Sequence, residues 1–424
     1  MSASQPLLFP AVEAVSRHSS VDDFIQELLE FRQFRTETQV ISIGDGDDTV
    51  PVFVNEFWTS KQRAASSLHE ISYRACFKPQ LPRFFVERLT AAEDRIYDPF
   101  LGRGTTMIEA ALLDRRVTGC DINPLSLILT APRLRPPTVR EVQARLATVD
   151  WNYDGEFNEE LLTFYHPDTL REICALRSHL MCRNGNNGTS DVDDWIRMVA
   201  TNRLTGHSAG FFSVYTLPPN QALTPKRQQK INEMRQQTPP RRSVPHLIIR
   251  KTESLLESVS ESDRSRLHKS ASDAVLLTRS ADHTPEIKSN SVDLIVTSPP
   301  FLDVVDYATD NWLRCWFNGI DESKIGIWTF RKPEEWAAAM QRVFRELRRV
   351  LKRGGYVAFE VGEVRRGKLK MEELVIPAAK AAKLKPLLVL INTQEFTKTS
   401  NCWGVTNQVA GTNTNRVILL QKST

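Results

Sequence analysis

The sequence predicts an α/β fold built on a seven-stranded, mostly parallel, Rossmann-like sheet that an inserted region interrupts. Short apolar runs alternate with helical patterns between residues 95 and 134, and the same alternation resumes at residue 274. Strands that alternate with helices are typical of a parallel sheet, because each parallel connection needs a crossover. The residues in between are polar and helix-prone but lack this rhythm. We therefore expect one sheet whose two halves are separated by an insertion.

The composition is that of an ordinary globular protein, with 424 residues, 41% of them hydrophobic and 25% charged. No run of about 18 apolar residues occurs, so we expect no membrane span. The first residues lack the basic and apolar segments of a secretory signal. Six cysteines without a Cys-x-x-Cys pair predict neither a disulfide framework nor a zinc site. We expect a cytoplasmic protein that binds no metal.

A strand–helix–strand pattern predicts the first half of the sheet. Residues 95–98 have the pattern of a strand, and a Gly-rich turn and a helix with an apolar face follow. Residues 116–121 are predicted to form the next strand, which completes one βαβ unit. Before this unit, Ser20 is placed to cap a helix whose apolar residues recur at helical spacing. We expect residues 1–70 to be a helical extension without chemistry.

The second half of the sheet contains strands at 274–278 and 292–297, followed by a long amphipathic helix from Glu334 to about Lys352. Gly354-Gly355 is expected to end that helix. Three more strands are predicted at 356–361, 387–392 and 416–420, the last of them antiparallel. The chain is thereby divided into four parts: 1–70, 71–137, 138–270 and 271–424.

The Gly-rich turn has the sequence Asp98-Pro-Phe-Leu-Gly-Arg-Gly-Thr-Thr106. Glycines at a strand-to-helix turn let the backbone approach a ligand closely. Neither a dinucleotide fingerprint nor a P-loop is present, because Met107 replaces the third glycine and the P-loop lysine is missing. Asp121 ends the next strand, where a carboxylate can accept both hydroxyl hydrogens of a ribose. The turn fits either a nucleoside cofactor or a plain tight turn.

A second pattern, Ser298-Pro-Pro-Phe301, directly follows an apolar strand. The two prolines fix the backbone and remove two donors. The Pro299 carbonyl and the Ser298 oxygen can accept the hydrogens of an exocyclic amine, while Phe301 stacks on the ring that carries it. The alternative is a structural turn that ends the strand.

Together the two patterns resemble the amino-group DNA methyltransferases of bacterial modification systems, which use S-adenosylmethionine. Residues 98–105 are similar to their cofactor motif I, and Asp121 falls at the ribose acid of motif II. Residues 298–301 are similar to catalytic motif IV, in a form more typical of cytosine-N4 than of adenine-N6 enzymes. Residues 75–82 resemble motif X, and Ser280-Ala-Asp282 occupies the place of motif III without its usual Gly-Asp turn.

The resemblance covers about 71–134 and 274–422, and weaker likeness extends to Arg203–Tyr215 and Gly411–Arg416. It implies a methyltransferase fold whose insertion at 138–270 recognises the DNA target. It also implies these catalytic residues: Ser298, Pro299, Pro300 and Phe301. The cofactor-binding residues that it implies are Phe77, Lys78, Pro79, Asp98, Pro99, Phe100, Gly102, Gly104, Thr105, Thr106, Asp121, Ile122 and Asp282.

The activity that the resemblance implies is methylation of cytosine N4 in double-stranded DNA, after the base is flipped out of the helix. A cognate restriction endonuclease that acts separately is a further expected partner. Methylation at cytosine C5 is excluded, because it needs a Pro-Cys nucleophile and none of the six cysteines follows a proline. Three alternatives stay open: adenine-N6 methylation, methylation of an RNA amine, and a DNA-binding module with an inactive core.

Basic residues are concentrated within the insertion. Residues 226–251 contain eight Lys or Arg and one acid, a net charge of +7, whereas the whole chain has a net charge of +4. The segment is either a solvated loop or a surface that contacts DNA phosphates. On the second interpretation, the expected DNA-binding residues are Lys226, Arg227, Lys230, Arg241 and Arg242.

Overall fold

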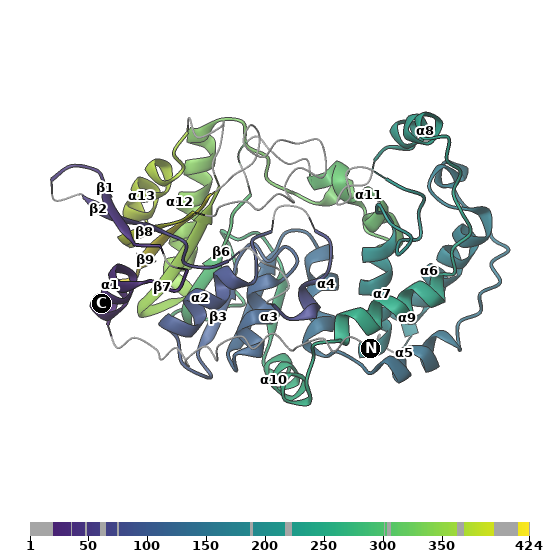
Figure 1. Cartoon of the computed structure of the whole chain (residues 1–424), viewed down its shortest axis with the longest axis horizontal. Helices are drawn as coiled ribbons and strands as arrows, with labels where there is room; N and C mark the ends of the chain where they lie inside the picture. The colour runs from purple at the N-terminus through teal and green to yellow at the C-terminus, as the bar shows by residue number, and fades with distance from the viewer. Residues whose placement is uncertain are drawn as a thin grey trace, which may run out of the picture.

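The structure is a computed structural model, and Figure 1 shows its course. The residues that it describes are 20–34, 36–46, 49–59, 65–73, 76–186, 190–216, 223–300, 302, 307–362, 369–393 and 414–423. One sheet with helices on both faces occupies one side of the molecule, and a group of helices from the insertion occupies the other (Figure 1). Among the described residues, no helix has both the length and the apolar content that a membrane crossing needs.

The sheet is mixed and mostly parallel, with the order β1-β2-β8-β9-β7-β6-β3-β4-β5. The seven predicted strands all form: β3 (Arg95–Asp98), β4 (Arg116–Asp121), β5 (Val275–Thr278), β6 (Val292–Thr297), β7 (Leu351–Val361), β8 (Lys385–Thr393) and β9 (Thr414–Gln421). β9 runs antiparallel to both of its neighbours, as predicted. The α/β class and the parallel character of the sheet are thus confirmed.

The predicted number of seven strands is too low by two. Residues 1–70 form the expected helix α1 (Val21–Glu30), which Ser20 caps, but they also form β1 (Gln39–Ile43) and β2 (Val50–Asn55). β2 pairs in parallel with β8, and β1 pairs antiparallel with β2. The segment therefore extends the sheet beyond β8. Its strands lack a clear alternating pattern, because nearly all of β1 is exposed and β2 is largely buried.

Two hydrophobic layers hold the sheet. Along β9, Val417 and Leu419 face one layer, while Ile418 and Leu420 face the other, as the two-residue repeat of a strand requires. The first layer contains the helices α2 (Gln80–Leu89), α3 (Thr105–Leu112) and α4 (Leu125–Leu134). The second contains α12 (Pro333–Val350) and α13 (Glu372–Ala381).

The insertion is helical and shares the first hydrophobic layer. Its longer helices are α5 (Val139–Leu146), α6 (Pro167–Asn186), α7 (Asp191–Arg203), α8 (Pro225–Met234), α9 (Val244–Leu256) and α10 (Glu261–Ser272). Trp195 is fully buried, belongs to the same cluster as the sheet residues, and donates from Nε1 to Thr252 Oγ1 at 3.1 Å. The insertion is therefore packed onto the core through apolar contacts.

The expected role of Gly354-Gly355 is wrong. α12 ends at Val350, and β7 begins at the next residue, so that both glycines lie inside the strand. Gly354 has a φ of +75°, and a Cβ at Gly355 would lie 2.8 Å from the Asp293 carbonyl oxygen. The glycines sit where the register of β7 against β6 shifts, between Val292 and Leu294. They allow the backbones of two paired strands to approach closely at this shift, and they do not cap the helix.

Asn392, at the end of β8, fastens the N-terminal strands to the core. Its Oδ1 accepts from the backbone nitrogens of Phe57 at 2.7 Å and Trp58 at 3.1 Å, and its Nδ2 donates to the Trp58 carbonyl at 3.2 Å. The side chain is fully buried. It thus satisfies backbone groups that water cannot reach.

We expect Asn392→Ala to lower the free energy of unfolding by about 2–3 kcal/mol, because buried backbone groups lose their partners. Urea unfolding followed by circular dichroism measures this. The matched control is Asn152→Ala, whose side chain is exposed. Equal stability of the two variants would contradict the role of Asn392.

Candidate active site

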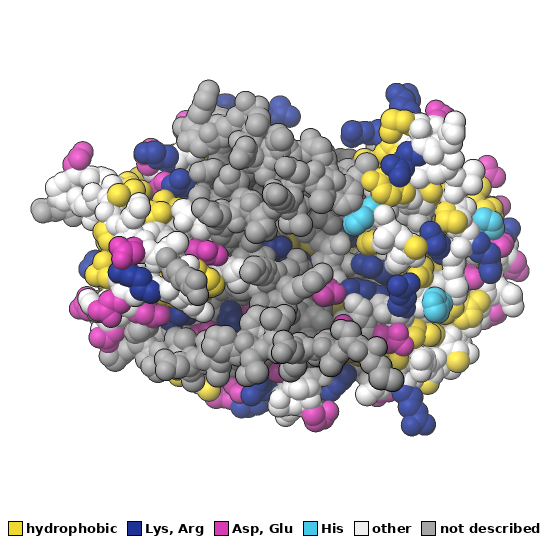
Figure 2. Space-filling view, viewed as in Figure 1, with side chains coloured by type: hydrophobic (Ala, Val, Ile, Leu, Met, Phe, Trp, Pro, Cys, Tyr) yellow, Lys and Arg dark blue, Asp and Glu magenta, His cyan; other side chains and the backbone are white. Residues whose placement is uncertain are grey.

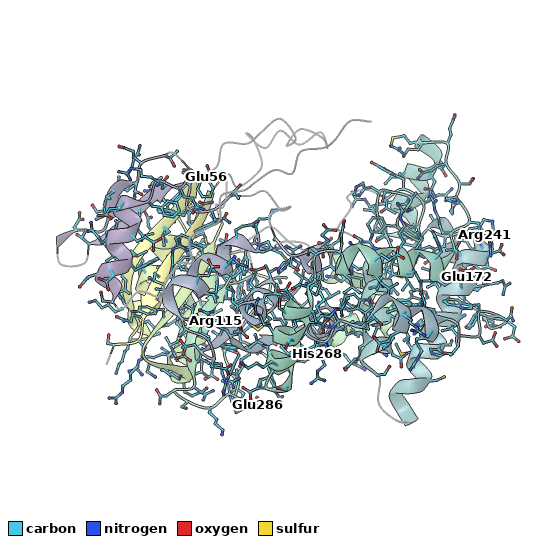
Figure 3. All side chains as sticks on the ribbon, turned by 60° about the horizontal axis from the view of Figure 1, so that its bottom comes forward. Glu56, Arg115, Glu172, Arg241, His268 and Glu286 are labelled. Atoms are coloured by element: carbon cyan, nitrogen blue, oxygen red, sulfur yellow. The ribbon has the colours of Figure 1, made fainter. Side chains whose placement is uncertain are left out.

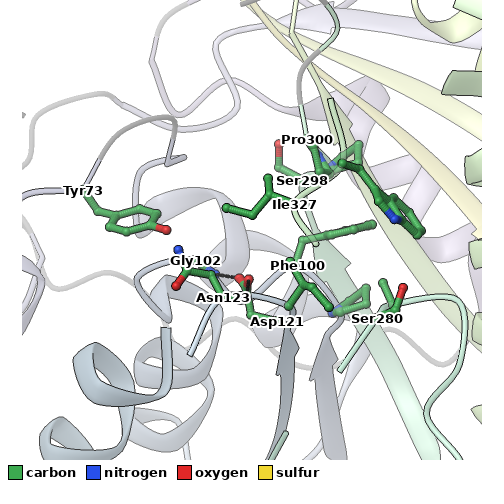
Figure 4. Close-up of a pocket in the computed structure, with 14 residues that line it drawn as sticks. Tyr73, Phe100, Gly102, Asp121, Asn123, Ser280, Ser298, Pro300 and Ile327 are labelled. Atoms are coloured by element: carbon green, nitrogen blue, oxygen red, sulfur yellow. Dashed lines mark hydrogen bonds between the residues drawn. The ribbon is translucent and has the colours of Figure 1, made fainter. Parts of the chain in front are cut away.

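A cavity opens at the carboxyl ends of four neighbouring strands, β6, β3, β4 and the edge strand β5 (Figure 4). It encloses about 700 Å³, including its open mouth. Its wall is formed by Tyr73, Pro99, Phe100, Gly102, Asp121, Ile122, Asn123, Ser280, Ala281, Ser298, Pro299, Pro300, Ile327 and Trp328. The cavity therefore brings together the Gly-rich turn, the residues at the ends of β4 and β5, and the Ser-Pro-Pro segment.

The Gly-rich turn owes its shape to two glycines. Gly102 and Gly104 have φ values of +51° and +73°, which favour glycine. A Cβ on Gly104 would lie 2.3 Å from Thr130 Oγ1, so that no other residue fits. Gly104 directly precedes α3, and its own nitrogen donates to the Leu101 carbonyl at 2.7 Å. The turn thus brings backbone close to the cavity.

Asp121 lies at the floor of the cavity, at the end of β4 (Figure 4). Its Oδ2 accepts from the Gly102 nitrogen at 2.8 Å, and its Oδ1 accepts from the Asn123 nitrogen at 2.9 Å. Burial raises the pKa of the Asp121 carboxyl, whereas these backbone donors act in the opposite direction. The Ser126 side chain and the Ile122 backbone also act as donors and lower this pKa. The carboxylate is therefore held in place by its neighbours at the cavity wall.

Asp98 has a different place from the one that the sequence suggested. It is 1% exposed and is absent from the cavity wall among the described residues. Its Oδ1 accepts from Thr297 Oγ1 at 2.6 Å and from the Phe100 nitrogen at 3.1 Å. Burial raises the pKa of this carboxyl to about 7, against the effect of both donors. Asp98 thus joins the ends of β3 and β6 beneath the cavity.

This pKa makes stability depend on pH. The carboxyl binds its proton more tightly in the folded chain, where its pKa is about 7, than in the unfolded chain, where the ordinary value is 3.8. The stabilisation is fully present below about pH 4 and is lost as the pH rises to about 7. We expect the free-energy difference between wild type and Asp98→Asn to fall through this window by at most about 1.4 kcal/mol per pH unit. Urea unfolding of both proteins between about pH 5 and pH 8 checks this, and a constant difference would contradict it.

Two residues that sequence analysis did not assign support the Ser-Pro-Pro segment. The Ser298 hydroxyl donates to the carboxylate of Glu360 on β7, which also accepts from Asn415 Nδ2 at 3.0 Å. Burial raises the pKa of Glu360, which is 4% exposed. Trp336 on α12 donates from Nε1 to the Pro300 carbonyl at 2.9 Å. The available signal for Glu360 was a carboxylate in the otherwise apolar second half of the strand, residues 356–361.

Several predicted site residues lie behind the wall. Thr106 donates to the Val296 carbonyl at 3.2 Å, and Thr105 accepts from Arg103 Nε at 3.1 Å. Both hydroxyl groups therefore form hydrogen bonds with other buried groups of the protein. Asp282 accepts from Ser280 Oγ at 2.6 Å and from Arg342 Nε at 3.1 Å. Its neighbours Ser280 and Ala281 form the wall in its place.

Tyr73, which lies two residues before the segment that resembles motif X, belongs to the cavity wall. Arg103, at 7% exposure, holds this segment by donating to the carbonyls of Ile71 at 3.0 Å and Phe77 at 3.4 Å. The predicted residues Phe77, Lys78 and Pro79 are absent from the wall among the described residues. Burial lowers the pKa of Lys78. Phe301, the last predicted catalytic residue, lies outside the described residues.

The predicted DNA-binding residues divide into two groups. Lys226, Arg227 and Lys230 are exposed on α8, and Figure 2 shows basic side chains over this helix at the upper right. Arg241 instead forms ion pairs with Asp168 at 3.1 Å and Glu172 at 3.2 Å (Figure 3).

The backbone nitrogen of Arg242 donates to Thr169 Oγ1 at 2.7 Å, and its side chain is half-buried. Of the five predicted DNA-binding residues, the three on α8 are thus the most accessible to a ligand. In the described part of the chain, no group of three or more His, Cys, Asp or Glu side chains is placed to hold a metal ion.

Residues 25–127 match the family model whose description is "DNA methylase" and whose name covers N6 and N4 enzymes alike. The match begins in α1 and continues past β4, so it includes β1 and β2. The first 70 residues, for which the sequence suggested no family, are therefore mostly part of this domain.

Curated relatives support the same assignment. The chain is 24% identical to the Type II methyltransferase M.BsoBI of Geobacillus stearothermophilus over 296 residues, which cover 61% of this chain and 54% of that protein. It is 28% identical to the Type II methyltransferase M.MjaII of Methanocaldococcus jannaschii over 103 residues, 24% of this chain and 19% of that one. The chain thus spans about half or less of the length of these relatives.

Among solved structures, the geranyl diphosphate C-methyltransferase of Streptomyces coelicolor A3(2) is 9% identical, with a TM-score of 0.33. The superposition covers 81% of this chain and 78% of that one. The family and sequence matches together confirm the predicted resemblance to amino-group DNA methyltransferases.

Proposed function

We propose that this member of the amino-group DNA methyltransferases, which carries their DNA methylase domain, transfers a methyl group from S-adenosylmethionine to an exocyclic amine in double-stranded DNA. The amine that we propose first is N4 of cytosine. One observation carries the proposal: the ribose-type carboxylate Asp121 and the Ser298-Pro299-Pro300 segment line the same cavity. A methyl donor bound at one end would therefore meet an amine held at the other.

The residues of the cavity fit S-adenosylmethionine. The Asp121 carboxylate, oriented by two backbone donors, suits the two ribose hydroxyls. The close backbone at Gly102 and the aromatic ring of Phe100 border the remaining space. When bound, this cofactor would supply an electrophilic methyl group to the amine. Tyr73 closes the wall at the opposite end from Ser280 (Figure 4).

The Ser-Pro-Pro segment would hold the amine. An exocyclic amine is a weak nucleophile, because its lone pair is delocalised into the ring, and acceptors that draw its hydrogens out of plane restore the lone pair. Ser298 donates its own proton to Glu360, so the lone pairs of its oxygen are free to accept from the amine. Trp336 fixes the Pro300 carbonyl and thereby the orientation of the turn. Phe301 is proposed to stack on the base.

Glu360 also offers a place for the proton that the amine loses. The excess proton can pass to the Ser298 oxygen while the Ser298 hydroxyl proton passes to Glu360, so that charge is conserved at each step. The raised pKa of Glu360 favours this acceptance. Glu360 is thus a positioning residue that acts through Ser298.

The direct test is mass spectrometry of nucleosides from double-stranded DNA that was treated with the purified chain and S-adenosylmethionine. N4-methylcytosine supports the full proposal. N6-methyladenine would instead identify N6 of adenine as the acceptor, which the family also covers. Modified nucleosides in structured RNA alone would contradict DNA as the substrate. Absence of any product, with cofactor binding retained, would favour the inactive DNA-binding module. A cognate endonuclease stays a proposed partner.

We expect Glu360→Gln to lower the single-turnover methylation rate about 100-fold, because the acceptor behind Ser298 is lost. In the wild type the rate should rise with pH through the raised pKa of Glu360, since the deprotonated form is required, and this rise should be absent in the variant. Affinity for S-adenosylhomocysteine should stay unchanged. An unaltered pH profile in Glu360→Gln would show that the carboxyl has only a packing role.

We expect neutralising Lys226, Arg227 and Lys230 to weaken DNA binding on all sequences and to flatten the dependence of log affinity on log salt by roughly one unit per lost phosphate contact. The matched control is Arg241→Gln, because Arg241 is already paired with two acids. Fluorescence anisotropy at several salt concentrations measures both. A slope changed as much by the control as by the α8 variant would contradict this assignment.

A further inference from the structure

A segment without an assigned role covers the cavity. Residues 325–330 connect the short helix η5 (Glu322–Lys324) to α12, and Ile327 and Trp328 of this segment belong to the cavity wall. Ile327 lies across the cavity from Asp121 (Figure 4). The segment thus lies on the side opposite the proposed ribose acid.

Trp328 is held by aromatic and cationic neighbours. Its ring centroid lies 6.5 Å from that of Phe100 at an interplanar angle of 65°, and 5.9 Å from that of Phe330 at the same angle. The Arg342 guanidinium carbon lies 5.8 Å from the Trp328 centroid. The side chain is half-buried. Edge-to-face contacts of this kind fix a ring while leaving part of it available to another planar group.

Arg342 is itself anchored by Asp282. The Arg342 Nε donates to Asp282 Oδ2 at 3.1 Å, and Ser280 Oγ donates to Asp282 Oδ1 at 2.6 Å. Each Asp282 oxygen thus has one donor, and Asp282 itself is absent from the wall among the described residues. Contacts therefore link four residues near the Ser280 end of the cavity: Ser280 to Asp282, Asp282 to Arg342, and Arg342 to Trp328.

We propose that Trp328 binds the adenine ring of the cofactor, and that Asp282 supports this binding through Arg342 rather than by contact with the base. The inference rests on the proposed function. Asp121 fixes the ribose at the floor, and the methyl group must reach Ser298, so the adenine is directed to the end near Ser280. Phe100 and Trp328 supply the aromatic surface there that a purine prefers.

The experiment is calorimetry without DNA, with S-adenosylhomocysteine and S-inosylhomocysteine as ligands. We expect Trp328→Ala to weaken both ligands about 10-fold or more, and Trp328→Phe to retain most of the affinity, because stacking is the interaction that is lost. Circular dichroism establishes that each variant is folded. Wild-type affinity in folded Trp328→Ala would overturn the proposal.

A double-mutant cycle tests the role of Asp282. Asp282→Asn and Arg342→Gln should each weaken both ligands a few-fold, and the double variant should lose no more than either alone, because the two act in series. The matched control is Arg345→Gln, an exposed arginine on the same helix, which should bind as the wild type does. The variants Asp282→Asn and Arg342→Gln also test the proposal if Trp328→Ala fails to fold.

The inosyl ligand separates the two roles of Asp282. If Asp282 accepted directly from the adenine amine, Asp282→Asn would abolish the preference for the adenosyl over the inosyl ligand, whereas Arg342→Gln would keep it. That result would overturn the proposal. Failure of the wild type to bind either ligand would overturn the proposed function itself, and with it this inference.

Discussion

The buried hydrogen bond from Thr297 to Asp98 is the constraint on which the site depends. It is 2.6 Å long and joins residues 199 positions apart, at the carboxyl ends of the neighbouring strands β3 and β6. Because these strands are parallel and adjacent, the turns that follow them emerge at the same edge of the sheet. The Gly-rich turn follows Asp98, and the Ser-Pro-Pro segment follows Thr297. A displacement of either strand end would therefore separate the proposed cofactor site from the proposed acceptor site.

The insertion is joined to the same site through a reciprocal pair of hydrogen bonds. Asn202 on α7 accepts from the Ser72 nitrogen at 2.9 Å and donates to the Ser72 carbonyl at 2.9 Å. Arg314 donates to the same carbonyl at 3.1 Å. The next residue, Tyr73, belongs to the cavity wall. A shift of α7 against the core would therefore displace Tyr73 at the cavity wall. Apolar packing and the hydrogen bonds between Asn202 and the Ser72 backbone both hold α7 at this boundary.

Local patterns were sufficient for the parts of the fold that repeat locally. The strands around the cavity and the strand-to-helix turn were predicted because apolar runs, glycines and prolines carry their own conformational preferences. β1 and β2 were missed because β2 pairs with β8, more than 300 residues further along the chain, and β1 joins the sheet only through β2. The role of Gly354-Gly355 was wrongly predicted because a helix end and a close approach of two paired strands favour the same residue. Only the neighbouring strand decides between them.

The residues of the cavity wall could be predicted where one segment supplies them, as with Asp121 and Ser298. The site could not be predicted where two distant side chains meet, as with Glu360 behind Ser298. Charge shows the same limit. The basic stretch of the insertion has a net charge of +7 in the sequence, yet Arg241 meets Asp168 and Glu172 from a preceding helix. A charge that is paired in space contributes little to the field that a polyanion feels, so the net charge of the sequence overstates the charge of the surface. Lys226, Arg227 and Lys230 on α8 remain exposed, as do Arg235 and Arg250.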